Sequence, residues 1–487
     1  MLKPSEIKTL INQDAASIRK KLAKVGQRYY EADHDIRDYR IFFINADGNL
    51  EEDKYKSNIK IRHPFFTEIV DQEVQYMLSG KDGFVKSDNP DLQAELDSYF
   101  NENEDFISEF TELLTGAISK GFEYMYAYKN EDFVTAFRCA DSMGIVEVKA
   151  NETDDHCEYL IYSYADGCTK DNKLITRIMV WDKSQVYYFV QEGDEEIKVD
   201  ASQKPNPRPH TVYRNGEAEG VYYEDYGVIP FFRLDNCKKQ FSGLQPIKDL
   251  IDDYDLIACG LSNNIQDTNE ALYVVKGYEG DNLDELLLNV KAKKHIGVDS
   301  EGGVDIKTID IPYEARKTKL ELDEKNIYRF GMAFNSALLG DGNITNVVIK
   351  SRYALLDLKC NKLEIRIKQF MRKLLKIVLK EINDRDGTDY QQKDVYFAFE
   401  REIMTNASDN AQIELTDAQK QQTQIGTLLN LASYLDNETL MQNICDVLDI
   451  SYNEIKDRLP EQGDPYSPQT ALDALNGGNP SGGGVNE

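Results

Sequence analysis

Two long helical segments separated by a short α/β insert constrain this chain more than any other feature. The first begins near Pro246, and it carries apolar residues at helical spacing: Ile247, Leu250, Ile251, Tyr254, Ile257, Leu261 and Ile265. The second begins at 310–312, and its apolar row is sparser: Leu320, Ile327, Phe330 and Phe334. Because one chain offers little to cover such helices, we expect them to pack against neighbouring copies.

The insert between these helices, residues 271–309, has short runs typical of strands on both sides of a helical run at 283–290. Runs at 295–298 and 304–309 are predicted to be its last two strands. The pair Gly302-Gly303 is predicted to make the turn between them.

The rest of the chain divides into helical and strand-rich parts. Helical spacing covers 5–32, 64–78 and about 104–120. Between 122 and 232, β-branched and aromatic runs predict a meandering antiparallel sheet. Twelve of the 29 tyrosines lie there, and we interpret them as half-buried strand faces rather than platforms for stacking bases. A strand at 393–400 and short helices beyond 408 follow.

The longest predicted helix covers about 351–383 and has two unlike faces. Its apolar seam is Leu356, Leu363, Ile367, Phe370, Leu374 and Ile377. Its other face is basic: Lys350, Arg352, Lys359, Lys362, Arg366, Lys368, Arg372, Lys373, Lys376, Lys380 and Arg385. The simpler interpretation is a solvated face paired with acidic neighbours, and a functional surface is the alternative.

The charge of the whole chain is strongly acidic. There are 57 Lys and Arg residues against 86 Asp and Glu, for a net charge of −29. A protein that grips nucleic acid by its phosphates should be basic, at least locally. Solubility alone can account for the excess, and a surface past which a polyanion slides is the alternative.

Motifs for catalysis and cofactor binding are not found. There is no GxxxxGK[ST], HExxH or GxSxG sequence, and the five histidines are widely separated along the chain. The calcium-like start at Asp341 lacks the later glycine and glutamate. Asp252, Asp253 and Asp255 are interpreted as an acidic helix face. We therefore expect no enzyme activity, cofactor or metal.

The N-terminus lacks the apolar core of a secretory signal, and no apolar run is long enough to span a membrane. The seven scattered cysteines indicate reduced thiols.

Several stretches, in order, resemble the portal family of long-tailed phages of Gram-positive hosts. They begin with Tyr29-Tyr30, His34 and Ile36. The next stretch is Asn58-Ile59, His63, Phe65, Ile69-Val70-Asp71, Val74, Tyr76 and Gly80. Further stretches are Gly121 with Tyr124, then Gly227-Val228-Ile229-Pro230 with Asn236, and then Leu250–Tyr254 with Ser262 and Asp267. Asn437–Leu440 and 454–461 resemble the family's C-terminal pattern more loosely. Ala258-Cys259 and Asn437 depart from it.

The resemblance implies an α+β multi-domain portal fold. It consists of long stem helices with an inserted α/β clip, a mixed α+β wing and a helical C-terminal crown. The implied domains are an N-terminal helical arm (1–24), wing (25–240), stem helix (241–270), clip (271–309), stem helix (310–335), tunnel loop (336–350), long wing helix and strand (351–404), crown (405–470) and flexible tail (471–487).

The resemblance also implies a ring of about twelve subunits at the unique capsid vertex of the virion, assembled in the bacterial cytoplasm. Double-stranded DNA would pass through the ring during packaging and ejection. The implied partners are the terminase large subunit, a head-completion or adaptor protein, and the major capsid and scaffolding proteins. The candidate DNA-facing residues are Ser336, Leu338, Leu339, Asp341, Asn343, Thr345, Asn346, Lys350 and Arg352.

A candidate docking surface on the clip contains Lys291, Lys293 and Lys294, for which a solvated loop is the simpler interpretation. Two other classes are weighed against the portal assignment. One is another phage head structural protein, a minor capsid or scaffold component, which would lack the helix–insert–helix stem. The other is a nuclease or terminase, which would need a carboxylate cluster or a P-loop.

Overall fold

A computed structural model describes residues 2–45, 47–53, 56–151, 157–215, 220–268, 272–278, 298–307, 313–335, 346–402, 407–431, 434 and 437–448. The chain divides into two compact units, and each is described by itself. The first comprises 1–339 and 352–402, and the second comprises 340–351 and 403–487.

The N-terminal helical stretch forms two helices where the sequence predicts one. Helix α1 covers Pro4–Ala15 and α2 covers Ile18–Tyr30. Ser17 separates them because its side chain accepts a hydrogen bond from the Lys20 backbone N–H and caps α2. The helical turn η1 (Asp35–Asp38) and the hairpin of β1 (Phe42–Ile44) and β2 (Leu50–Glu52) follow.

The predicted helices at 64–78 and 104–120 are confirmed. Helix α3 covers Phe65–Met77 and α5 covers Glu104–Lys120. Between them lie β3 (Val85–Ser87), α4 (Pro90–Leu96) and the turn η2 (Asp97–Asn101). Gly121 ends α5 with a φ of +97°. A Cβ there would meet the Gln240 carbonyl oxygen at 2.3 Å, so this position requires glycine.

The strand-rich part is antiparallel, as predicted, but it forms two main sheets and a hairpin. The first sheet has the order β14-β4-β5: Phe231–Asp235, Phe122–Lys129 and Thr135–Ala140. The second has the order β10-β9-β8-β7-β6, with β11 also paired to β9. Its strands are β6 Ile145–Lys149, β7 Cys157–Cys168, β8 Leu174–Trp181, β9 Gln185–Glu192, β10 Lys198–Val199 and β11 Arg208–Pro209. Strands β12 (Thr211–Asn215) and β13 (Gly220–Glu224) form the hairpin.

Both faces of the second sheet are covered. On one face, Ile7 of α1 packs in a cluster with Val146, Ile161, Ile178, Val180 and Phe189. On the other, Ala23 of α2 packs in a cluster with Phe122, Tyr124, Leu160, Trp181 and Phe231. Tyr162 and Tyr188 are partly buried against the second cluster, which agrees with the interpretation of tyrosines as strand-face residues.

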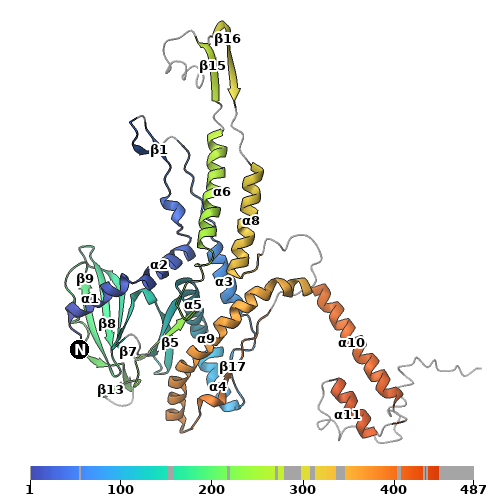
Figure 1. Ribbon diagram of the computed structural model, residues 1–487. Helices are drawn as coiled ribbons and strands as arrows, with labels where there is room; N and C mark the ends of the chain where they lie inside the picture. Colours follow the sequence, from blue (N-terminus) through green and yellow to red (C-terminus); the bar gives the residue numbers. More distant parts are fainter. Residues whose placement is uncertain are drawn as a thin grey trace, which may run out of the picture. The chain divides into compact units, whose positions relative to one another are not determined.

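The helix–insert–helix segment has the expected helices, α6 (Lys248–Thr268) and α8 (Tyr313–Gly331), which lie side by side (Figure 1). The described part of the insert is a pair of antiparallel strands, β15 (Leu272–Tyr278) and β16 (Val298–Lys307). The predicted turn at Gly302-Gly303 is wrong, because both residues lie inside β16, where Gly303 pairs with Lys276. The predicted helix at 283–290 lies outside the described residues.

The longest helix, α9, covers Asn346–Asp386 and begins five residues earlier than the sequence predicted. Every residue of its predicted seam is buried: Leu356, Leu363, Ile367, Phe370, Leu374 and Ile377. Strand β17 (Val395–Phe397) follows and pairs with β3. In the second unit, α10 (Ala407–Asn430) is longer than the short helices predicted there, and it packs on α11 (Asn437–Val447).

Candidate functional site

An extended segment, residues 57–63, lies along α6 and is bonded to it by its backbone; we refer to it as the strap. Four alternate backbone N–H groups of the strap donate to four side chains on α6. The pairs are Ser57 to Asp267 Oδ1 at 3.1 Å, Ile59 to Asn263 Oδ1 at 2.6 Å, Ile61 to Cys259 Sγ at 3.1 Å and His63 to Asp255 Oδ1 at 3.0 Å.

We call these four hydrogen bonds the ladder. The spacing of its N–H donors along the strap matches the spacing of its acceptors along α6 for a simple geometric reason. Alternate residues of an extended chain point the same way and lie about 6.6 Å apart. Residues four apart on a helix share a face and lie about 6 Å apart along its axis. A polar side chain at every fourth position of α6 therefore meets every second N–H of the strap.

The carboxylate of Asp255 is the most buried acceptor of the ladder, at 0% exposed. Its Oδ2 accepts a hydrogen bond from His34 Nδ1 at 2.6 Å, and its Oδ1 accepts one from His63 Nδ1 at 2.7 Å. Burial opposes ionisation, but the hydrogen bonds from His34 and His63 outweigh it and hold the pKa of Asp255 below its ordinary value. The interpretation of Asp255 as part of an acidic surface is therefore wrong, and two histidines distant in sequence meet here.

The base of α6 is also bonded to the end of α2. The Tyr29 hydroxyl donates to Asp252, and the Lys248 ammonium lies 2.6 Å from Asp252 and 2.7 Å from Asp35. The Tyr29 ring stacks on His34, with ring centroids 4.6 Å apart. Burial and the bond to Asp252 raise the pKa of Tyr29. Tyr29 and His34, which resemble the family signature, thus bind α6 through Asp252 and Asp255.

The buried face of α6 differs from the predicted one. Ile247 and Ile251, at the foot of the helix, are buried as expected, but Ile265 is 51% exposed. Along the upper helix the buried side chains are instead polar or small: Asp255, Cys259 and Asn263. The repeat of these residues with Asp267 every four positions was visible in the sequence, but an apolar criterion does not detect it.

Large apolar side chains are left exposed on both α6 and α8. They are Leu256 (40%) and Ile265 on α6, with Tyr313 (52%), Leu322 (51%) and Phe330 (49%) on α8. Phe330 belongs to the predicted sparse apolar row. Ile327 and Phe334 of the predicted row are buried. Helices with this surface are only partly covered by their own chain.

Most residues of the predicted tunnel loop lie outside the described residues: Ser336, Leu338, Leu339, Asp341, Asn343 and Thr345. Asn346, Lys350 and Arg352 lie on the first turns of α9, so this end of the predicted loop is helical. Lys350 is exposed. The three lysines of the predicted clip, Lys291, Lys293 and Lys294, also lie outside the described residues.

The basic face of α9 is only partly paired with acidic neighbours. Lys359 lies 2.8 Å from Glu73, Lys368 lies 2.7 Å from Glu364, and Arg385 lies 2.7 Å from Glu95. Lys362, Arg366, Lys373, Lys376 and Lys380 have no ion pair within the described parts of the chain. The simpler interpretation of this face therefore holds for some of its residues.

Among the described residues, no group of three or more His, Cys, Asp or Glu side chains could hold a metal ion. Within the same residues, no helix is long and apolar enough to cross a membrane.

Comparison with known proteins gives consistent matches. The family described as "Phage portal protein, SPP1 Gp6-like" matches residues 9–458. The portal protein of Bacillus phage SPP1 is 28% identical over 394 residues, which cover 80% of this chain and 75% of the relative. The portal protein of Clostridium phage phiCD119 is 24% identical over 432 residues, which cover 84% of this chain and 88% of the relative.

A solved structure, the neck of a native GTA particle computed with C12 symmetry, covers 80% of this chain and 90% of its own, with a TM-score of 0.37 and 13% identity. Since the family match spans nearly the whole sequence, the chain belongs to the SPP1 Gp6-like family of phage portal proteins. This family is structural rather than enzymatic.

Proposed function

We propose that this chain is the subunit of a closed ring of about twelve copies that forms the DNA channel at the unique vertex of a phage capsid. The observation that carries the proposal is the stem. Leu256 and Ile265 on α6 and Leu322 on α8 expose apolar surface along helices that a single copy covers only in part. Neighbouring copies packed side by side would bury these residues, and closed symmetry would leave none of them free.

Within this ring, double-stranded DNA passes along the axis during packaging and ejection, without sequence specificity. The net charge of −29 per subunit favours passage over adhesion, because an acidic wall repels phosphates. A narrow basic band would come from Lys350 and Arg352 at the start of α9. The segment 336–350 remains the candidate tunnel loop.

The insert, which includes β15 and β16, is proposed as the clip that docks the terminase large subunit during packaging and a head-completion or adaptor protein afterwards. Lys291, Lys293 and Lys294 are its candidate contacts. The major capsid and scaffolding proteins would surround the ring during assembly in the bacterial cytoplasm, and the ring would then remain in the virion. No catalytic role is proposed for any residue.

Electron micrographs of the purified full-length protein test the ring directly. Top views should show closed rings of about twelve or thirteen subunits around a central hole. Monomers or solid assemblies without a hole, under the same conditions, would overturn the proposal. ATPase and nuclease assays on the same sample should show no activity above that of the buffer.

A further inference from the structure

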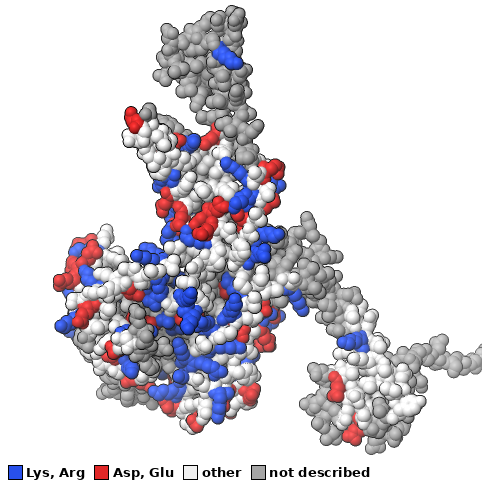
Figure 2. Space-filling model, viewed as in Figure 1, with Lys and Arg blue, Asp and Glu red and all other residues white. Residues whose placement is uncertain are grey.

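Five cations of α9 form a single row on one face of the helix; we call them the cationic row. They are Lys362, Arg366, Lys373, Lys376 and Lys380. Their spacings of 4, 7, 3 and 4 residues keep them on one side of a helix, over about 27 Å of its axis. All are exposed except Arg366, which is partly buried. Lys and Arg side chains gather along this part of the molecule in Figure 2.

A cavity of about 620 Å³ adjoins the row and is cationic. It lies between α9 and the strands β6, β7 and β14, and five cationic side chains line it against two acidic ones. Both acidic residues are already bound to Arg233: Glu147 at 2.7 Å and Asp235 at 2.8 Å. The uncompensated charge therefore comes from Lys183, Arg366 and Lys373, with Lys149 at 3.9 Å from Glu147.

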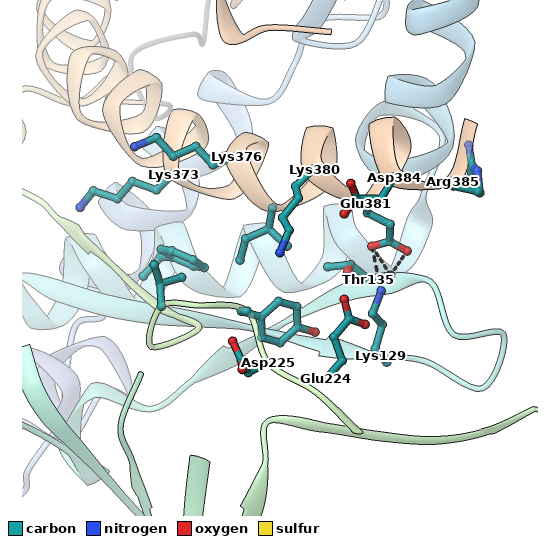
Figure 3. Close-up of a pocket in the computed structure, with 14 residues that line it drawn as sticks. Lys129, Thr135, Glu224, Asp225, Lys373, Lys376, Lys380, Glu381, Asp384 and Arg385 are labelled. Carbon is teal, nitrogen blue, oxygen red and sulfur yellow. Dashed lines mark hydrogen bonds and ion pairs between the residues drawn. The ribbon is translucent and has the colours of Figure 1, made fainter. Parts of the chain in front are cut away.

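The other end of the row is closer to neutral. A second cavity, of about 560 Å³, is lined by Lys373, Lys376 and Lys380 but also by Glu224, Asp225 and Asp384 (Figure 3). Glu381 in this cavity is held by Lys129 at 3.2 Å and by two hydrogen bonds from the Thr135 backbone N–H at 3.1 Å. The positive charge is thus strongest around Arg366 and Lys373.

We propose that the cationic row, with Lys183 and Lys149 beside it, binds the phosphate backbone of duplex DNA without sequence specificity. The charge complementarity is specific to this region, because the chain as a whole is strongly acidic. Successive cations in the row stand about 4.5–6 Å apart along the axis where the spacing is three or four residues, and long lysine side chains adapt to a repeating line of phosphates.

This contact goes beyond the proposed channel. It requires no residue of the segment 336–350. It concerns the binding of DNA to the protein rather than the passage of DNA through the channel. Because the remainder of the protein repels DNA, the binding should be weak and strongly dependent on salt.

The test is fluorescence anisotropy of a labelled 30-base-pair duplex with the full-length protein, from 50 to 200 mM NaCl. The test variant is Arg366→Gln/Lys373→Gln/Lys376→Gln. The matched control is Lys21→Gln/Lys24→Gln/Lys170→Gln, which removes the same charge from exposed positions outside the row. Two duplexes of unrelated sequence should bind alike.

The test variant should bind at least about tenfold more weakly at 50 mM salt. It should also have a salt dependence shallower by about one unit of log–log slope per lost phosphate contact. The control should bind within about twofold of the unchanged protein. Failure of the unchanged protein to bind at 50 mM salt would overturn the proposal, as would equal losses in both variants.

A third result would also overturn it: assembly measured by mass photometry changes in the test variant while its DNA binding does not. The row would then be an interface between copies of this chain. The ring seen by microscopy is a separate readout, so failure of the DNA contact leaves the proposed channel function standing.

Discussion

His63 donates two hydrogen bonds to one oxygen of Asp255, from its backbone N–H at 3.0 Å and from its ring Nδ1 at 2.7 Å. The second oxygen, Oδ2, accepts a hydrogen bond from His34 Nδ1 at 2.6 Å. One carboxylate thus joins α6 to the strap and to the segment after α2. Removing its charge would leave buried donors without their ionic acceptor.

Asp255→Asn should lower the free energy of unfolding by about 2–4 kcal/mol, because buried hydrogen bonds to a charged group are lost and one amide N–H₂ faces a donor. Asp253→Asn is the matched control on the same helix. Asp253 is 43% exposed beside Lys319, so its loss should cost less than about 1 kcal/mol. Urea unfolding measures both, and equal losses would contradict a special role for Asp255.

The contribution of Asp255 should depend on pH in a defined direction. Its pKa is lowered in the folded protein, so the ionised group contributes stability above the pKa of the unfolded state, about 4. That contribution is lost as the pH falls through the folded-state pKa. The stability difference between the unchanged protein and Asp255→Asn should be constant from pH 6 to about 5 and shrink below about pH 4. A stability difference at pH 3 equal to the one at pH 6 would contradict a lowered pKa of Asp255 in the folded protein.

Proline substitutions in the strap distinguish the contribution of the ladder hydrogen bonds to stability from the general effect of placing a proline in this segment. Ile59→Pro removes the N–H that donates to Asn263 at 2.6 Å and leaves that buried side chain without its donor. We expect a loss of about 1–3 kcal/mol. Lys60→Pro, one residue further, removes an exposed side-chain bond to Arg37 but no ladder bond, and it should cost less than about 1 kcal/mol. Equal effects of the two prolines in thermal unfolding would show that the ladder is unimportant.

Gly26 of α2 faces α5 so closely that a Cβ would lie 2.0 Å from the Ser119 carbonyl oxygen. Gly26→Ala should therefore destabilise the protein by about 1–3 kcal/mol through overpacking. Gly260→Ala in α6 is the control, since its Cβ would meet only Arg316 at an ordinary 3.7 Å. That change should be neutral or stabilise by up to about 1 kcal/mol. A stabilising Gly26→Ala would mean that α2 and α5 lie farther apart than described.

Leu256→Ser and Ile265→Ser should weaken ring assembly by roughly tenfold or more each, since an apolar side chain buried between copies contributes about 1.5–3 kcal/mol. Leu174→Ser is the control, because Leu174 is 49% exposed on β8, away from the stem. Analytical ultracentrifugation against concentration gives the comparison. Assembly unaffected by the stem variants would argue that these side chains stay exposed in the ring.

The sequence predicted the helices and strands well where the periodic signal is local. The buried seam of α9 and the positions of helices α6 and α8 are examples, since apolar residues at helical spacing indicate a helix. Apolar spacing alone does not tell which residues the chain itself covers: Ile265 and Phe330 belong to the predicted apolar rows and are exposed. The turn predicted at Gly302-Gly303 is wrong because glycine also fits inside a strand.

The site around Asp255 was harder to predict for a different reason. It joins residues more than 190 positions apart, and no single segment contains the pattern. His34 and His63 are 29 positions apart and meet only because the strap returns along α6. The polar repeat at 255, 259, 263 and 267 was a usable signal, but it predicts a polar partner only when an extended segment is known to lie beside it.

The ladder between the strap and α6 has a mechanical consequence. Its four bonds share one period, so a small slide of the stem along the strap would misalign all of them together. A slide of about 6 Å, the length of four residues of α6, would bring the N–H groups of residues 59, 61 and 63 near the side chains of Asp267, Asn263 and Cys259. The contact between the strap and α6 therefore opposes small sliding movements and permits displacement of α6 along the strap only in discrete steps.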